Sequence, residues 1–150
     1  MGRLIKLAVV VAVLFFAWKY ALPWIQRQSG SSPRSNATAS QSSCTGSAAR
    51  ASEAWGSGLH GFVNPPYDLA AWSTFRSDVE SKIAAADSEC ACSSESCSKA
   101  HSAMRDLRAL VSDLDTAVRN GSPPPSDAVQ RQESIDRQID EATELVRAGK

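Results

Sequence analysis

The longest apolar run of the chain extends from Leu7 to Ile25, with Lys19 as its only charged residue. About 20 helical residues are enough to cross the ~30 Å hydrocarbon core of a bilayer. We therefore expect residues 1–25 to form a cytoplasmic stub and a transmembrane anchor, with the helix at about residues 4–25. Two basic residues precede the run, Arg3 and Lys6.

The flanks of this run predict its orientation in the cell membrane. Basic residues at the start of a span tend to remain cytoplasmic, and aromatic residues gather at the membrane interface. The far end carries Trp18, Tyr20 and Trp24. These features favour a single-pass, N-in protein whose C-terminal domain is periplasmic or extracellular. A cleaved signal peptide is the alternative, because it also has a basic start and an apolar middle.

Residues 26–43 are rich in serine and contain no acidic residue. A segment of this composition buries too little apolar surface to offset the entropy lost on ordering. We expect it to be a flexible linker between the anchor and a domain at residues 44–150.

Apolar residues in this domain recur at helical spacing in four stretches, and no alternating pattern is long enough to indicate a strand. The stretches are Cys44–Trp55, Leu69–Cys90, Cys97–Val118 and Val129–Val146. Asn64 and Pro65 resemble a helix start, with an N-cap followed by proline. Asn120 and Gly121 resemble a helix end.

Short connections between successive helices favour antiparallel neighbours. The sequence therefore predicts an all-α fold, a small up-down bundle of three to four helices. The fourth stretch is thin, because Ile135 and Ile139 supply nearly all of its apolar content. It either closes the bundle or pairs with another copy, which would give a weak homo-oligomer through residues 127–148. The aromatic residues of the first two stretches and the loop between them are expected in the core: Trp55, Phe62, Tyr67, Trp72 and Phe75.

The net charge of zero conceals an uneven distribution. Five of the 16 basic residues and none of the 16 acidic residues lie in the first 35 positions, which leaves 11 bases against 16 acids in the remainder. An acidic domain without a basic cluster argues against nucleic acid as a partner.

Antiparallel packing places the four cysteines at one end of the bundle. Cys44 begins the first stretch, Cys90 and Cys92 follow the second, and Cys97 begins the third. An even number of cysteines in a small exported domain indicates disulfides. The favoured pairing is Cys44–Cys90 with Cys92–Cys97, and the pairing Cys90–Cys97 with Cys44–Cys92 is close behind.

A zinc site is the sharper alternative use of these thiols. Four thiolates satisfy a tetrahedral site, and His101 lies one turn after Cys97. The spacing departs from the common zinc patterns, because the sequence has no pair of cysteines separated by two residues. A redox-active dithiol also usually consists of two cysteines separated by two residues, so the same absence argues against one. The alternative ligands are Cys44, Cys90, Cys92, Cys97 and His101.

Other motifs do not indicate catalysis. Gly56–Gly61 matches the dinucleotide-binding glycine pattern but follows a helical stretch rather than a strand. His60 and His101, the only histidines, are expected at opposite ends of the bundle, with His101 partly buried. We therefore expect no catalytic residues, no cofactor and no enzymatic activity.

The functional hypothesis is a membrane-anchored protein that displays a disulfide-stabilised helical bundle outside the cytoplasm. Its partners would be the lipid bilayer and an unidentified protein, in an interaction or envelope-structural role. The alternative is a metal-binding or thiol-redox domain that uses the clustered cysteines.

Overall fold

The computed structural model describes residues 33–149. Within them the chain forms four α-helices, a short 3-10 helix and no strand. The helices are α2 (Pro33–Leu59), α3 (Leu69–Glu89), α4 (Glu95–Arg119) and α5 (Ala128–Arg147), and η1 (His60–Phe62) follows α2. The all-α prediction is confirmed for this part of the chain. The transmembrane helix expected at residues 4–25 lies outside it.

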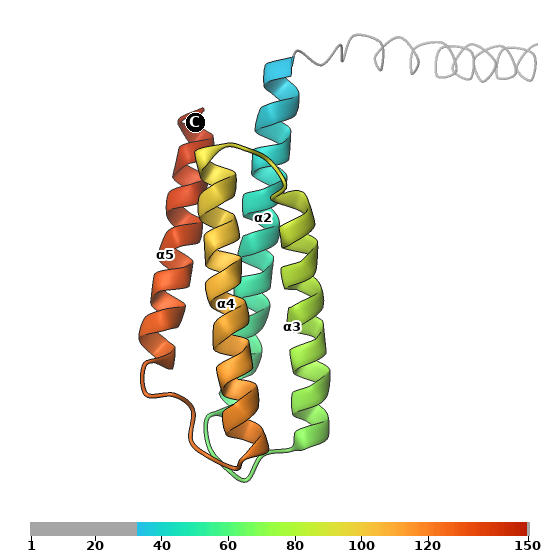
Figure 1. Ribbon diagram of the computed structural model, residues 1–150, viewed down its shortest axis with the longest axis vertical. Helices are drawn as coiled ribbons and strands as arrows, with labels where there is room; N and C mark the ends of the chain where they lie inside the picture. The colour runs from blue at the N-terminus through green and yellow to red at the C-terminus, as the bar shows by residue number, and fades with distance from the viewer. Residues whose placement is uncertain (1–32, 150) are drawn as a thin grey trace, which may run out of the picture. The chain divides into compact units, whose positions relative to one another are not determined.

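Successive helices run antiparallel and form an up-down bundle (Figure 1). The α3–α4 turn lies at one end, which we call the cysteine end. The α2–α3 and α4–α5 connections lie at the other, which we call the loop end. α4 contacts both α3 and α5. None of the helices within residues 33–149 combines the length and the apolar character that a membrane span requires.

α2 packs through a face of small side chains. Cys44, Ala48 and Ala51 are fully buried on it, as is Trp55 nearer the loop end. Three hydroxyl residues border this face and are also buried: Thr45, Ser47 and Ser52. The helical stripe predicted for this stretch is confirmed, and its small side chains leave room for close helix packing.

α2 begins at Pro33, so residues 33–43 are helical in the structure where a flexible linker was expected. Residues 26–32 of that linker lie outside the described part of the chain. Lengthening an existing helix costs much less than nucleating one, and the packed segment from Cys44 onward supplies the nucleus. Proline is suited to a first helical position, because the missing N–H would have no helical partner there.

α3 starts later than the sequence predicts. Asp68 is its N-cap, and its Oδ1 accepts hydrogen bonds from the N–H groups of Ala70 and Ala71 at 2.9 and 3.0 Å. The start predicted at Asn64 and Pro65 is wrong. Each of those residues precedes a proline, which disfavours the helical conformation. Leu69, expected in the buried stripe, is the first residue of α3 and is 56% exposed.

α4 is the central helix of the core. The apolar residues spaced three or four apart in the predicted stretch are all buried, with Ala100 rather than His101 facing inward: Cys97, Ala100, Met104, Leu107, Val111, Leu114 and Val118. The Ser94 side chain caps its start by accepting the N–H of Cys97 at 3.2 Å. Its end follows the prediction: Gly121 has a φ of 64°, and the N–H of Ser122 donates to the carbonyl of Ala117 at 2.9 Å. Together with the bond from the Gly121 N–H to the carbonyl of Val118 at 3.1 Å, this bond forms a Schellman cap.

α5 closes the bundle within one chain. Ile135, Ile139 and Ala142 are buried, with exposures of 4% or less. The sequence left open whether this helix closes the bundle or pairs with another copy, and in the structure it closes the bundle. Val129 was expected in this stripe but is 69% exposed, because it lies in the first turn, ahead of the first buried residue.

The aromatic residues form the core at the loop end, as predicted. Trp55 stacks on Phe75 with ring centroids 5.8 Å apart, and Phe62 meets Trp72 edge-on at 5.1 Å. Tyr67 lies at the margin of this cluster, where its hydroxyl donates to the carbonyl of Ser122 at 2.9 Å. This bond joins the α2–α3 connection to the α4–α5 connection.

Candidate functional site at the cysteine end

Two disulfides form at the cysteine end, and they are the favoured pair from the sequence. Cys44 is bonded to Cys90 with a Cα–Cα distance of 4.6 Å, and Cys92 to Cys97 with one of 5.8 Å. Cys44 does not begin its helix, as the sequence suggested, because α2 extends back to Pro33. It still lies level with Cys90 at the end of α3. The first bond therefore joins α2 to α3, and the second spans the α3–α4 turn.

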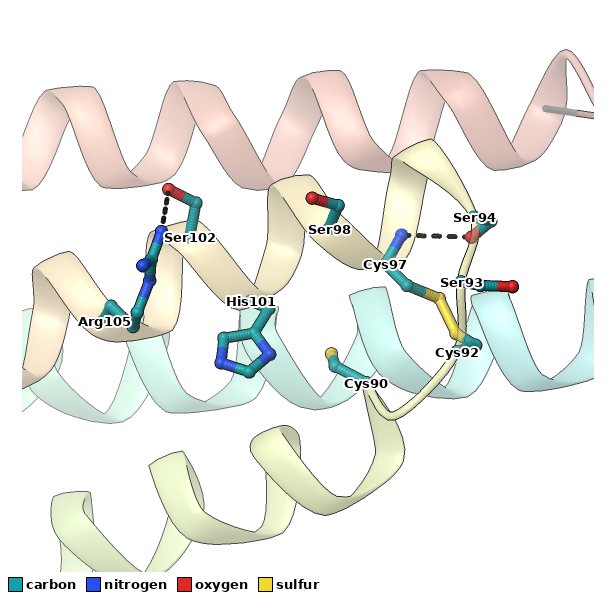
Figure 2. Close-up of a pocket in the computed structure, with 9 residues that line it drawn as sticks. All are labelled: Cys90, Cys92, Ser93, Ser94, Cys97, Ser98, His101, Ser102 and Arg105. Atoms are coloured by element: carbon teal, nitrogen blue, oxygen red, sulfur yellow. Dashed lines mark hydrogen bonds between the residues drawn. A yellow bond between two sulfur atoms is a disulfide. The ribbon is translucent and has the colours of Figure 1, made fainter.

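An open groove of about 490 Å³ runs along this turn and the start of α4. Figure 2 shows the Cys92–Cys97 bond on its wall, with the side chains of His101 and Arg105 along its length. Arg105 donates to Ser102 Oγ at 3.4 Å. The remaining lining residues are Cys90, Ser93, Ser94 and Ser98.

The histidines lie as far apart as the sequence implied, at opposite ends of the bundle. His60 is in η1 at the loop end, and His101 is in α4 beside the cysteines. His101 was expected to be partly buried, but it is exposed. The reason is the register of α4, in which the neighbouring Ala100 takes the inward position.

The alternative zinc ligands are only partly brought together. Cys90, Cys92, Cys97 and His101 line one groove, whereas Cys44 is buried in α2 and bonded to Cys90 without lining the groove. Among residues 33–149 all the cysteines are in disulfides, and no cluster of three or more His, Cys, Asp or Glu residues is arranged to hold a metal ion.

A carboxylate network that the sequence did not reveal supports the Cys44–Cys90 bond. Glu89, adjacent to Cys90, accepts hydrogen bonds from the hydroxyls of Ser43 and Ser47 on α2. Arg50 donates to Ser47 Oγ at 2.5 Å. The hydrogen bond from Ser43, and then the weaker effect of the one from Ser47, lower the pKa of Glu89 below its ordinary value. The network thus links α2 to α3 beside the disulfide.

A second network links α3 to α4 toward the loop end. Asp115 accepts the indole N–H of Trp72 at 2.8 Å and forms ion pairs with Arg76 and Arg119 at 2.9 Å. Partial burial raises the pKa of Asp115, but the hydrogen bonds from Trp72, Arg119 and Arg76 outweigh it, so that the pKa lies below its ordinary value. The sequence carries no signal for this contact. Nothing in the residues around Trp72, near the start of α3, indicates that its indole binds Asp115 of α4.

Exposed apolar side chains lie toward the loop end. Three large hydrophobic residues are exposed in the described part of the chain: Val63 at 46%, Leu69 at 56% and Val129 at 69%. They lie in or directly after the α2–α3 and α4–α5 connections. Sequence reasoning missed Leu69 and Val129 because both fit the helical spacing of a buried stripe.

Comparisons with known proteins give no further assignment: no family model, no curated protein and no solved structure matches the chain.

Proposed function

We propose that this protein is anchored in the cell membrane by one N-terminal helix, N-in, and displays the bundle outside the cytoplasm as a protein–protein interaction module without catalysis. The anchor rests on the apolar run from Leu7 to Ile25. The compartment is supported by the two disulfides, because such bonds persist in oxidising surroundings and are rare in the cytosol.

The observation that carries the interaction role is the position of the exposed apolar side chains. Leu69 and Val129 are more than half exposed at the loop end, and Val63 in the α2–α3 connection is 46% exposed. A contiguous exposed apolar patch is typical of a contact site for other proteins, and we propose that these side chains belong to one. A rigid, cross-linked bundle presents them without a further ordering cost, which favours binding.

Topology is tested with the full-length protein in membranes. A membrane-impermeant protease added to intact cells, or to spheroplasts if the organism has an outer membrane, should degrade the bundle and leave the N-terminus protected. Extraction at alkaline pH should leave the protein in the membrane fraction. Release of the whole chain by alkaline extraction, or protection of the bundle in intact cells, would contradict the proposal.

The interaction role is tested by site-specific photo-crosslinking in the same membranes. A photoreactive residue in place of Leu69 should give a discrete adduct with one protein. The matched control replaces Ala84, which is also exposed on α3 but lies away from the loop end. An adduct at position 69 that is absent at position 84 supports the proposal. Equal labelling at both positions, or none at position 69, contradicts it.

The alternative role, metal or thiol chemistry, is favoured by one observation, the convergence of Cys92, Cys97 and His101 on an open groove. Intact-mass measurement with and without reductant distinguishes disulfides from a metal site. Two native disulfides give a mass increase of four hydrogen atoms on reduction, whereas a metal site gives four alkylatable thiols and a stoichiometric metal ion.

A further inference from the structure

The two disulfides differ in their access to solvent. Both sulfur-bearing residues of the α2–α3 bond are buried, with Cys44 at 0% and Cys90 at 3% exposure. In the turn bond, Cys97 is also at 0%, but Cys92 is only partly buried. Both residues of the Cys92–Cys97 bond line the open groove (Figure 2), but only Cys92 is in part exposed to solvent.

From this geometry we infer that Cys92–Cys97 is a thiol–disulfide exchange site that takes low-molecular-weight thiols at the Cys92 sulfur. The inference does not depend on the proposed interaction role, which concerns the loop end. A thiolate must approach a disulfide along the sulfur–sulfur axis, and the burial of Cys97 leaves only the Cys92 side open to it.

The position of Cys97 favours its departure. Cys97 lies in the first turn of α4, where its N–H is bound by the Ser94 cap. The positive end of the helix dipole favours a thiolate at this position and opposes the effect of burial, which disfavours one. A better-stabilised leaving thiolate departs faster in disulfide exchange.

The exchange balances in two steps. An attacking thiol loses its proton and the thiolate forms a bond to Cys92 Sγ. The Cys92–Cys97 bond breaks, and its electron pair leaves with Cys97 Sγ, which takes up the released proton. A second thiolate then attacks the added sulfur of this mixed disulfide and releases Cys92 as a thiolate, which also takes a proton. Overall, two thiols are oxidised to one small disulfide while the protein disulfide becomes a dithiol.

The groove also fits an anionic thiol such as glutathione. Arg105 and His101 line it beyond the disulfide, whereas Glu95, the acidic residue of the first turn of α4, is not among its lining residues. A positively charged side chain in a groove raises the local concentration of an anion. Neutral thiols should enter without this advantage.

The test uses full-length protein in detergent, exposed to reduced glutathione and quenched with acid at intervals. Fragment masses locate the first glutathione adduct. We expect it on Cys92, with loss of the Cys92–Cys97 bond at least about tenfold faster than loss of Cys44–Cys90, because exchange rates follow access to the attacked sulfur. A first adduct on any other cysteine, or equal rates of loss, would overturn the inference.

Two variants test the same asymmetry without relying on reduction. In Cys97→Ser the free Cys92 thiol should react with an alkylating reagent under native conditions, whereas in Cys92→Ser the free Cys97 thiol should react at least about tenfold more slowly. Circular dichroism establishes that both variants remain folded. Equal alkylation rates in folded variants would contradict the shielding of Cys97.

The route through the groove has its own control. Arg105→Gln should slow the reaction with glutathione by about two- to fivefold and leave the reaction with neutral mercaptoethanol unchanged, because only the anion is attracted. Arg119→Gln, at the other end of α4, should change neither rate. If Arg105→Gln alters neither rate, or both equally, the thiol does not enter by this groove.

Discussion

Gly58 lies in the last turn of α2, where the ring of Phe75 packs directly against its Cα. A methyl group added at Gly58 would overlap the ring atoms Cε2 and Cδ2 of Phe75. The ring has little room to move, because it is stacked between Trp55 and Phe62 at centroid distances of 5.8 and 5.4 Å. Gly58→Ala should therefore lower the free energy of unfolding by about 1 to 3 kcal/mol, as overpacking does.

Gly56 provides the matched control for this prediction. It lies in the same helix, and an added Cβ there meets no atom within 4 Å. Gly56→Ala should leave stability unchanged or raise it by up to about 1 kcal/mol through helix propensity. Urea unfolding followed by circular dichroism measures both variants, and equal effects would show that the contact with Phe75 does not restrict position 58.

Asp115 should make the stability of the domain depend on acid pH. Partial burial raises its pKa, but the bonds from Trp72, Arg119 and Arg76 lower it further, so the folded-state pKa lies below the unfolded one. A group of this kind contributes stability above its unfolded pKa, and the contribution is lost as the pH falls through the folded pKa. The stabilisation should be complete near neutral pH and disappear below about pH 4.

The variant Asp115→Asn should therefore be less stable than the parent at pH 7, with a difference that narrows as the pH is lowered. Urea unfolding at a series of pH values measures it. Asp78→Asn is the control, because Asp78 pairs with Lys82 while 57% exposed and such pairs contribute little. A difference for Asp115→Asn that stays constant down to pH 2.5, about a unit below the ordinary aspartate pKa, would contradict the prediction.

At the scale of elements, the two disulfides should contribute unequally to stability. Cys44–Cys90 closes a loop with a sequence separation of 46, and Cys92–Cys97 one of 5. The chain-entropy model gives about 4 kcal/mol for the first and about 2 kcal/mol for the second. Replacing each pair by alanine and comparing urea unfolding curves measures both, and equal losses would contradict the model for this chain.

How far the sequence predicts each element depends on whether local spacing or a distant partner determines it. The periodic spacing of α4 predicts its buried face because apolar residues recur every three or four positions from Cys97 to Val118. The same rule fails for Leu69 and Val129, because the first turn of a helix can extend past the ends of the helices against which it packs. The start of α2 was missed because helix extension depends on the packed segment that follows it.

The site was predicted in part for the same reason. Helix direction alone brings the cysteines to one end, and that follows from the order of the helices. The contacts of Glu89 with Ser43 and Ser47 depend instead on how α2 and α3 are aligned along their length. No spacing within either helix encodes this alignment. The predicted Cys44–Cys90 bond sets this alignment only at one point, and the hydroxyl contacts of Glu89 become visible in the structure.

At the scale of the whole molecule, the thin apolar face of α5 raises the question of whether the four helices unfold as one unit. Ile135 is 1% exposed against the rest of the bundle, and Ser52 of α2 donates to Asp136 of α5 at 2.6 Å. These contacts connect α5 to the shared core. Ile135→Ala should therefore destabilise the entire domain by about 2 to 5 kcal/mol. That is a large part of the 5 to 15 kcal/mol typical of a domain.

The measurement compares two spectroscopic signals, each followed through the same unfolding transition. Circular dichroism reports all four helices, whereas tryptophan fluorescence reports mainly Trp55 and Trp72 in α2 and α3, although tryptophans near the N-terminus also contribute. If α5 belongs to the cooperative unit, both transitions shift together in Ile135→Ala, as two-state unfolding requires. Val129→Ala, at a 69% exposed position of the same helix, should move neither by more than about 0.5 kcal/mol. An early loss of helical signal with unchanged fluorescence would mean that α5 detaches alone, leaving its apolar face free for a second copy.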